Sequence, residues 1–314
     1  MISSNKMILV GLGKIGYKGF PETHYQSAIR NNLDVVAGID SSPEARSRFI
    51  ADTGIPAFES LDLLPADCWS SFFTVATASN ASFSLIKNLL SKDGPMGILV
   101  EKPFCENARQ SEEILSLQKV KETPLRVNYS RQYAGAMPLI KSLVENNKLI
   151  SGVVIYSSGL RENGSHFIRI ICGLFPSINP VTDIVRLDST RFKIRITGGV
   201  ELDFIPLESP HLHNSEIRLI FEEIMIAISE GMNIEIRRIN THSSIRTWPR
   251  ELELLFKGDF LDGFESSYLN QDWWRASSQT EILKDLKMDH LCNTIIEAAL
   301  RDSVNSTKGV ENDF

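Results

Sequence analysis

The sequence predicts an α/β protein with a doubly wound parallel sheet at its amino-terminal end, followed by an α+β domain with a large open, mainly antiparallel sheet. Strand-like and helix-like stretches alternate up to about residue 124, which indicates βαβ units. Beyond it, strand-like stretches follow one another with only short turns between them. The length of 314 residues favours two domains, and we expect them at residues 1–124 and 125–314.

The expected elements of the amino-terminal domain are short apolar strands separated by helical patterns. The strands lie at 6–13, 33–40, 71–77 and 96–103. Helices are expected at 23–31, at 42–54 with Pro43 in the first turn, and at 79–94, where Gly94 closes the helix. The second domain is expected to contain strands at 152–160, 183–189, 192–205, 215–229 and 233–248, with helices at 135–147, 165–175 and 278–304.

Composition excludes several classes of partner. The formal net charge is -6 and the pI is about 5.6, so no broad cationic surface is available for nucleic acid. No apolar run approaches the roughly 18 residues of a membrane span, and the sequence begins without a cleavable signal pattern. We therefore expect a cytoplasmic protein without a membrane partner. Four single cysteines (Cys68, Cys105, Cys172 and Cys292) are expected to be reduced and mostly buried.

A glycine-rich turn follows the first strand. Gly11, Gly13 and Gly16 form the pattern G-x-G-x-x-G, in which the first glycine supports a tight turn, the second lets the backbone approach a pyrophosphate and the third permits close helix packing. With Lys14 and Ile15 between them, these residues are candidates for binding a dinucleotide. A purely structural glycine turn is the alternative.

Asp40 strengthens the nucleotide interpretation. It lies 24 residues after Gly16, at the end of the second expected strand, where an acidic side chain accepts hydrogen bonds from both ribose hydroxyls. Because a carboxylate repels a 2'-phosphate, NAD is favoured over NADP as the cofactor. Arg46 lies nearby, either as a solvated charge or as a phosphate clamp.

Five residues, Tyr17 to Pro21, interrupt the chain where the first helix should continue after Gly16. We expect them to extend the loop at the rim of the cofactor crevice without displacing the glycines. Thr23 is expected to cap the helix that resumes.

A second chemical signal is the strand end "GILVEKPF", which carries Glu101, Lys102 and Pro103. Side chains at the carboxyl end of a parallel strand lie over the crevice where open α/β sheets bind ligands. Lysine there can exchange a proton with a substrate hydroxyl. Taken alone, an exposed lysine before a turn is the alternative.

In combination, the glycine pattern, "THYQSAIRNNLDVVAGID", "VATASNASFSLI", "LVEKPF", "VNYSRQYAGAMPLIKSLVENNKLISG" and "ENGSHFIRIICGLFP" resemble the glucose-fructose oxidoreductase and inositol dehydrogenase family, Gfo/Idh/MocA. The resemblance covers most of the first 175 residues. It implies a Rossmann domain, a bound nicotinamide cofactor with Thr77 and Glu101 among its contacts, and a sugar, sugar-nucleotide or polyol substrate. It also implies a homo-oligomer packed through the carboxy-terminal sheet.

The resemblance also implies roles for individual residues. Lys102 matches the catalytic lysine of the family, and the Lys102-Pro103 peptide is expected to be cis. His166 matches the histidine of its D-x-x-x-H pattern, and Glu162 occupies the aspartate position. One of Lys102 and His166 would take the hydroxyl proton during hydride transfer, and the carboxylate would orient the base. Asn128, Arg131 and Tyr133 match a segment near the substrate pocket.

Three positions depart from the family pattern. Arg169 stands where an aspartate is usual, Ser82 where a histidine is common and Ala78 where a proline is common. Arg169 either binds a carboxylate or phosphate of the substrate or forms an ion pair on the helix surface.

The proposed enzyme is an NAD-dependent sugar dehydrogenase. Family members from surface-polysaccharide gene sets with a similar insertion favour a nucleotide-linked sugar. A nucleotide-binding regulator or scaffold that lost turnover is the alternative, favoured by Glu162 and Arg169.

Two further features of the sequence allow more than one interpretation. His211 and His213 have the spacing of one strand face, but no third metal ligand is identifiable, so no metal site is expected. Trp273 and Trp274 either pack in the interior or edge the substrate pocket.

Overall fold

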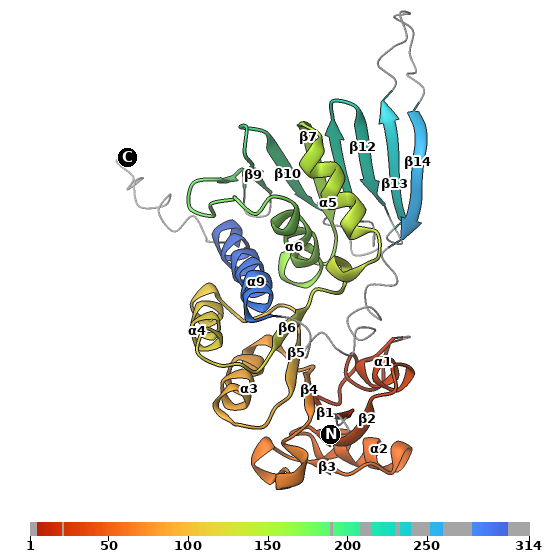
Figure 1. The fold of residues 1–314 in the computed structure, drawn as a ribbon, viewed down its shortest axis with the longest axis vertical. Helices are drawn as coiled ribbons and strands as arrows, with labels where there is room; N and C mark the ends of the chain where they lie inside the picture. The colour runs from red at the N-terminus through yellow and green to blue at the C-terminus, as the bar shows by residue number, and fades with distance from the viewer. Residues whose placement is uncertain are drawn as a thin grey trace, which may run out of the picture. The chain divides into compact units, whose positions relative to one another are not determined.

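The computed structural model describes residues 5–20, 22–188, 191–207, 215–229, 233–239, 252–259 and 278–300. They form two compact units (Figure 1). The first contains the described residues of 1–135 and 261–293, and the second contains those of 136–260 and 294–314. The first unit therefore continues beyond residue 124 and gains part of a helix from the end of the chain.

The first unit is built on a six-stranded parallel sheet in the order β3-β2-β1-β4-β5-β6. Both halves extend outward from β1 and β4, which is the doubly wound arrangement that the sequence predicted. The strands are β1 Lys6–Val10, β2 Asp34–Ile39, β3 Ala57–Phe58, β4 Phe72–Val75, β5 Gly97–Glu101 and β6 Leu125–Asn128.

Helices connect these strands. They are α1 His24–Arg30, α2 Pro43–Thr53, α3 Ser79–Ser91 and α4 Ala108–Gln118, with short 3-10 turns η1 Leu61–Leu63, η2 Ala66–Cys68 and η3 Ser130–Tyr133. Figure 1 shows α1 and α2 on one side of the strands and α3 and α4 on the other, as right-handed crossovers require. Helix α3 ends at Ser91, before Gly94, which was expected to close it. Helix α4 and strand β6 were not among the expected elements.

Helix α9, Gln279–Leu300, begins in the first unit and ends in the second. In the first unit it is joined to α4 by a hydrogen bond between Ser111 Oγ and His290 Nδ1 at 2.8 Å. The sheet beside them has apolar side chains on both faces, and all five residues of β5 are buried. Such continuous burial is characteristic of parallel strands covered by helices on both sides.

The second unit is an eight-stranded sheet in the order β14-β13-β12-β11-β7-β10-β9-β8. All its pairs are antiparallel except β7 with β10. The strands are β7 Leu149–Tyr156, β8 Ile184–Arg186, β9 Phe192–Arg195, β10 Glu201–Pro206, β11 Glu216–Phe221, β12 Ile224–Ile228, β13 Asn233–Ile239 and β14 Leu252–Asp259. This confirms the predicted open, mainly antiparallel sheet.

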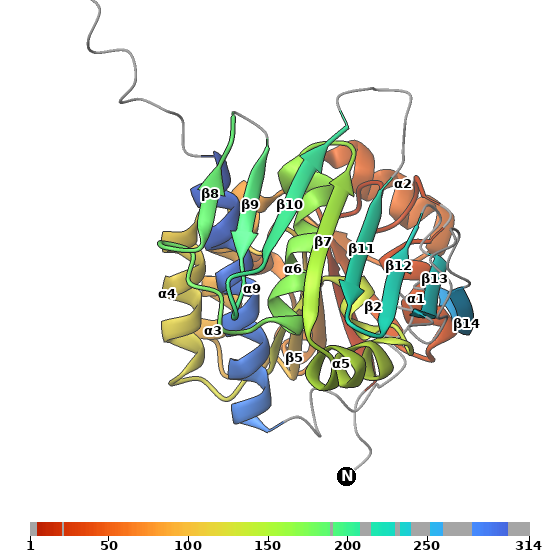
Figure 2. The same ribbon diagram turned by 90° about the horizontal axis from the view of Figure 1, so that it is seen from above.

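Helices α5 (Met137–Asn146) and α6 (Ser165–Leu174) lie on one face of this sheet (Figure 2). The burial of β12 alternates accordingly, because Ile224, Ile226 and Ile228 are buried whereas Met225 and Ala227 are half-exposed. Within the described part of this unit, α5 and α6 leave the other face of the sheet uncovered. The described strands thus present a broad sheet face.

Two whole-chain expectations can be compared with the described residues. None of the described helices is long and apolar enough to cross a membrane. The four cysteines are free thiols, with Cys68 half-buried and the other three buried, as the sequence predicted.

Candidate functional site

The glycine-rich turn has three positions with different steric requirements. Gly11 has a φ of +96°, and a Cβ there would lie 2.5 Å from the Ala76 carbonyl oxygen. A Cβ on Gly16 would overlap the Gly11 carbonyl oxygen, whereas a Cβ on Gly13 would have no heavy atom within 4 Å. The fold therefore needs glycine at the first and third positions, and the second leaves open space beside an exposed backbone. This is the space that a pyrophosphate would fill.

Asp40 joins this turn to the end of β2. Its Oδ2 accepts a hydrogen bond from the Leu12 N–H at 2.8 Å, and its Oδ1 accepts one from the Ser42 N–H at 2.9 Å. Each carboxylate oxygen retains further acceptor capacity for the hydroxyls of a ribose. Arg46 donates to the carbonyl oxygens of Asp40 and Ser41, so it braces the strand end and is not merely a solvated charge.

The inserted residues form a loop that bulges out of an otherwise continuous helical path. The His24 N–H donates to the Ile15 carbonyl and the Tyr25 N–H to that of Gly16, both at 3.0 Å. Each donor lies nine residues after its acceptor, whereas an α-helix places it four residues after. The chain between these donors and acceptors is thus five residues longer than in a continuous helix, and the helix resumes in register. Thr23 caps it by accepting a hydrogen bond from the Gln26 N–H, as predicted.

Tyr17 anchors the insertion to the first unit. Its ring is 8% exposed and makes edge-on contacts with the rings of Tyr25 and Phe49. Its hydroxyl donates to Asp52 on α2 at 3.1 Å, and Lys18 pairs with the same carboxylate. Burial and the Asp52 carboxylate raise the pKa of Tyr17 to about 12. The insertion is therefore held against α2 at its first residue.

A buried polar cluster lies at the carboxyl ends of β5 and β6. His24 is fully buried, and its Nε2 lies 2.9 Å from Oε1 of Glu101. Asn128 Nδ2 donates to the same oxygen at 2.6 Å. Burial acts to raise the pKa of Glu101, but the interactions with His24, the hydrogen bond from Asn128 and the charge of Lys102 outweigh it and hold the pKa below its usual value. Glu101 is thus an ionised carboxylate fixed from two sides.

Lys102 follows this cluster directly and is half-buried. The Lys102-Pro103 peptide is cis, which confirms the expectation drawn from the family resemblance. Sequence reasoning did not find His24 as the partner of Glu101, because nothing in "THYQ" indicates a contact 77 residues away.

The other substrate candidates of the first unit are already engaged with the protein. Asn128 is 2% exposed and holds Glu101. The Tyr133 hydroxyl donates to the Val127 carbonyl at 3.0 Å, and the Arg126 guanidinium lies over the Tyr133 ring. Arg131 is half-buried, and burial lowers its pKa to about 10, so it remains a cation at neutral pH.

Glu162, His166 and Arg169 belong to the second unit. Glu162 is exposed and lies in a π-helical turn, η4 Leu160–Gly164, directly before α6. A Cβ on Gly159 would overlap the Glu162 carboxylate, so the longer side chain folds back over a glycine with a φ of +82°. His166 is half-buried in the first turn of α6. Arg169 is 2% exposed, which corrects the alternative of an ion pair on the helix surface.

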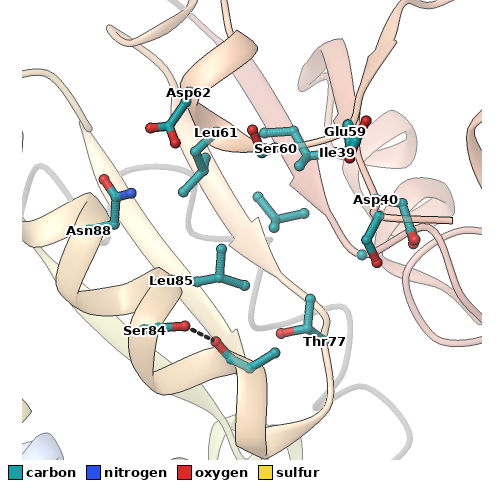
Figure 3. Close-up of a pocket in the computed structure, with 14 residues that line it drawn as sticks. Ile39, Asp40, Glu59, Ser60, Leu61, Asp62, Thr77, Ser84, Leu85 and Asn88 are labelled. Carbon is teal, nitrogen blue, oxygen red and sulfur yellow. Dashed lines mark hydrogen bonds between the residues drawn. The ribbon is translucent and has the colours of Figure 1, made fainter.

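A cavity of about 320 Å³ lies beside Asp40 in the first unit (Figure 3). It is lined by the ends of β1 and β2, the segment 59–62, Thr77 and one face of α3. Its only charged lining residues are acidic, namely Asp40, Glu59 and Asp62. Three of the lining residues, Asp40, Gly11 and Thr77, were predicted from the sequence as cofactor contacts. The other lining residues were not.

The family departures at Ala78 and Ser82 lie at the start of α3. Ala78 is its exposed N-cap residue, and Ser82 is fully buried, with its hydroxyl donating to the Ala78 carbonyl at 3.2 Å. The Ser82 and Thr77 hydroxyls lie 3.1 Å apart. Ser82 thus stabilises the turn that carries Thr77 into the cavity lining.

His211, His213, Trp273 and Trp274 lie outside the described residues. Within the described ranges, no group of three or more His, Cys, Asp or Glu side chains is arranged to hold a metal ion.

Comparison with known proteins identifies the first unit. Residues 5–129 match the Gfo/Idh/MocA model, which describes an oxidoreductase family with an NAD-binding Rossmann fold. This confirms the resemblance inferred from the sequence motifs.

Solved structures share the fold of the whole chain. Levoglucosan dehydrogenase in complex with NADH and levoglucosan aligns with a TM-score of 0.72 and 12% identity, over 94% of this chain and 96% of its own. UDP-N-acetylglucosamine 3-dehydrogenase from Acidithiobacillus ferrooxidans gives 0.69 and 11%, over 95% and 99%. A 3-ketoreductase from Actinomadura kijaniata in complex with NADP gives 0.67 and 13%, over 92% and 96%.

Proposed function

We propose that this chain, whose residues 5–129 match the Gfo/Idh/MocA oxidoreductase family, is an NAD-dependent dehydrogenase acting on a hydroxyl or keto carbon of a sugar. A nucleotide-linked sugar is the preferred substrate class, and a polyol is the alternative. The observation that carries the proposal is Asp40, whose carboxylate is held by the Leu12 N–H at the glycine turn and lines the adjoining cavity. Its position suits a ribose beside a pyrophosphate.

The residues of the first unit fit a dinucleotide. The open space at Gly13 accommodates the pyrophosphate, with Lys14 and Ile15 offering the neighbouring backbone, and the cavity accommodates the adenosine half. Since each of the three charged lining residues is acidic, a 2'-phosphate would meet like charges without a lysine or arginine in the lining. This supports NAD over NADP.

The chemistry follows from the residues at the strand ends and on α6. When bound, the nicotinamide supplies the hydride acceptor or donor at its C4 atom. Lys102 takes the proton from the substrate hydroxyl, or returns it to the keto oxygen, and His166 assists this transfer. Glu162 orients the histidine through its carboxylate. Lys102 stands next to the fixed Glu101, so its backbone position is well defined.

Two observations support a sugar substrate, and the second favours one that carries a phosphate or carboxylate group. The similar folds include dehydrogenases whose names specify levoglucosan and UDP-N-acetylglucosamine. Arg131 in the first unit and Arg169 in the second are candidate substrate contacts, with Asn128 and Tyr133, because a guanidinium suits bidentate binding of a phosphate. We propose that these residues orient the substrate.

The open sheet face of the second unit supports a homo-oligomer. Half-exposed apolar residues such as Val153, Ile155, Ile220 and Met225 alternate with buried ones along β7, β11 and β12. A second copy of the chain would cover them.

The proposal is tested by hydride transfer with a panel of sugars, polyols and nucleotide sugars, followed through NADH absorbance. Lys102→Met retains much of the side-chain volume but removes the amino group that exchanges the proton, so turnover should fall about 100-fold to 10,000-fold while NADH still binds. Lys119→Met, the same change at the exposed C-cap residue of α4, is the matched control. Near-normal turnover of Lys102→Met would refute the mechanism, and NAD binding without turnover of any substrate would favour the regulator.

A further inference from the structure

The segment between β7 and α6 departs repeatedly from regular backbone geometry. Ser158 has a φ of +62° and Gly159 a φ of +82°, so two successive residues have positive φ. The Asn163 and Gly164 N–H groups then both donate to the Gly159 carbonyl oxygen, at 3.2 and 3.1 Å, within the π-helical turn η4. Such backbone persists only where the surrounding structure enforces it, and it is concentrated at functional sites.

Packing within the second unit fixes the turn. A Cβ on Gly164 would lie 2.8 Å from Leu160 Cδ1 and 3.1 Å from the ring of Tyr156, so the backbone rests directly on these two side chains. Both side chains are buried. Asn163 Nδ2 donates to the hydroxyl of Ser215, directly before β11, at 2.9 Å. The backbone of η4 is therefore held from two sides.

The Glu162 side chain is the exposed feature of this fixed turn. Among residues 160–166, Glu162 alone is exposed. Side chains on a helical turn tilt toward its N-terminus, which brings Glu162 back over Gly159. A Cβ on Gly159 would overlap Glu162 Oε2 and would lie 3.4 Å from its Cδ. The carboxylate thus occupies the space that a side chain at position 159 would fill.

We propose that Gly159 is a positioning residue, because the space left by its missing side chain holds the Glu162 carboxylate in the orientation that turnover requires. This inference rests on the proposed function, in which Glu162 orients His166. It adds that a glutamate at position 162 needs a residue without a side chain at position 159.

A methyl group added at position 159 would act selectively on this carboxylate. The atoms that it would overlap belong to the end of a flexible, exposed side chain, so the carboxylate can move while the backbone stays. Glu162→Asp shortens the side chain by one methylene and removes the overlap. The positive φ strains alanine in either background, so the strain cancels when Gly159→Ala is compared between glutamate and aspartate at position 162.

The test is a double-mutant cycle in the full chain, with the sugar or nucleotide sugar of the panel that wild-type protein turns over fastest. Gly159→Ala should lower kcat at least about tenfold and leave the Kd for NADH unchanged, whereas in the Glu162→Asp background it should lower kcat less than about threefold. Gly199→Ala is the matched control in the same unit, because Gly199 has a φ of +79° and no heavy atom within 4 Å of an added Cβ. This control should leave kcat unchanged.

Two further measurements keep the test independent of substrate and of alanine strain. A crystal structure of Gly159→Ala should show the Glu162 carboxylate turned away from residue 159 on an unchanged η4 backbone. Gly159→Asn adds a Cβ at the same place with a residue that tolerates positive φ better, and its effect on kcat should depend on residue 162 in the same way.

The possible results separate this inference from the proposed function. An equal loss of kcat in both backgrounds, or a carboxylate that keeps its place in Gly159→Ala, overturns the inference alone. If wild-type protein transfers no hydride with any member of the panel, the proposed function fails and the inference fails with it.

Discussion

Replacing Gly13 with alanine distinguishes a dinucleotide site from a purely structural glycine turn. An added Cβ would have no heavy atom within 4 Å, and Gly13 is not among the glycines with positive φ. The fold therefore has no steric reason to require glycine at this position. A pyrophosphate approaching this backbone would, however, meet the new methyl group.

The expected magnitudes follow from these contacts. The free energy of unfolding should change by no more than about 0.5 kcal/mol, the usual range for an exposed site without special constraints. Moving a phosphate off its backbone N–H donors should cost about 1.5–3 kcal/mol of binding free energy, since such hydrogen bonds involve a charged group. This corresponds to a roughly 10-fold to 150-fold rise in the Kd for NADH.

The assay pairs an NADH fluorescence titration with urea unfolding, and two other glycines serve as controls. Gly16→Ala should lower stability by about 1–3 kcal/mol or more, because its Cβ would overlap the Gly11 carbonyl. Gly54→Ala, at the C-cap of α2 with a φ of +71° and open space, should lose about 1–2 kcal/mol of stability with unchanged NADH affinity.

Two results would refute the reasoning. Wild-type affinity in Gly13→Ala would show that no phosphate approaches this backbone. A loss of stability in Gly13→Ala comparable to that of Gly16→Ala would show that the turn itself requires the glycine.

Two further predictions concern cofactor choice and pH. NADH should bind at least about tenfold tighter than NADPH. Asp40→Ser should reduce this ratio, because it weakens NADH binding and admits the 2'-phosphate. Equal affinities for the two cofactors in wild-type protein would contradict the role of Asp40. Glu101→Gln should lower the free energy of unfolding by about 1–3 kcal/mol at neutral pH. Because the folded pKa of Glu101 is depressed, its contribution is present above the ordinary glutamate pKa of about 4.3 and is lost as the pH falls through the folded value. Urea unfolding across this range should show the stability difference between wild type and Glu101→Gln narrowing in acid, and a constant difference would be evidence against an ionised Glu101 carboxylate.

Local sequence signals predicted the elements that local interactions control. The Thr23 cap and the Pro43 helix start both occur, because a capping hydroxyl and a fixed proline φ act on the neighbouring backbone. Helix α4 was not predicted, although the sequence contains a capping residue for it. Asn107 accepts a hydrogen bond from the Gln110 N–H at 3.0 Å and so caps the helix. Strand β6 has only four residues, too few for periodicity to define.

The residues of the candidate site also fall into those that the sequence predicts and those that only the structure reveals. The sequence by itself determined the glycine turn, the acid at the end of β2 and the lysine at the end of β5, because each depends on residues close together in the chain. Only the tertiary structure placed Asp62 and Asn88 in one cavity lining and brought His24 to Glu101. These pairings depend on how strands and helices pack over long sequence separations, where no periodic pattern connects one partner to the other.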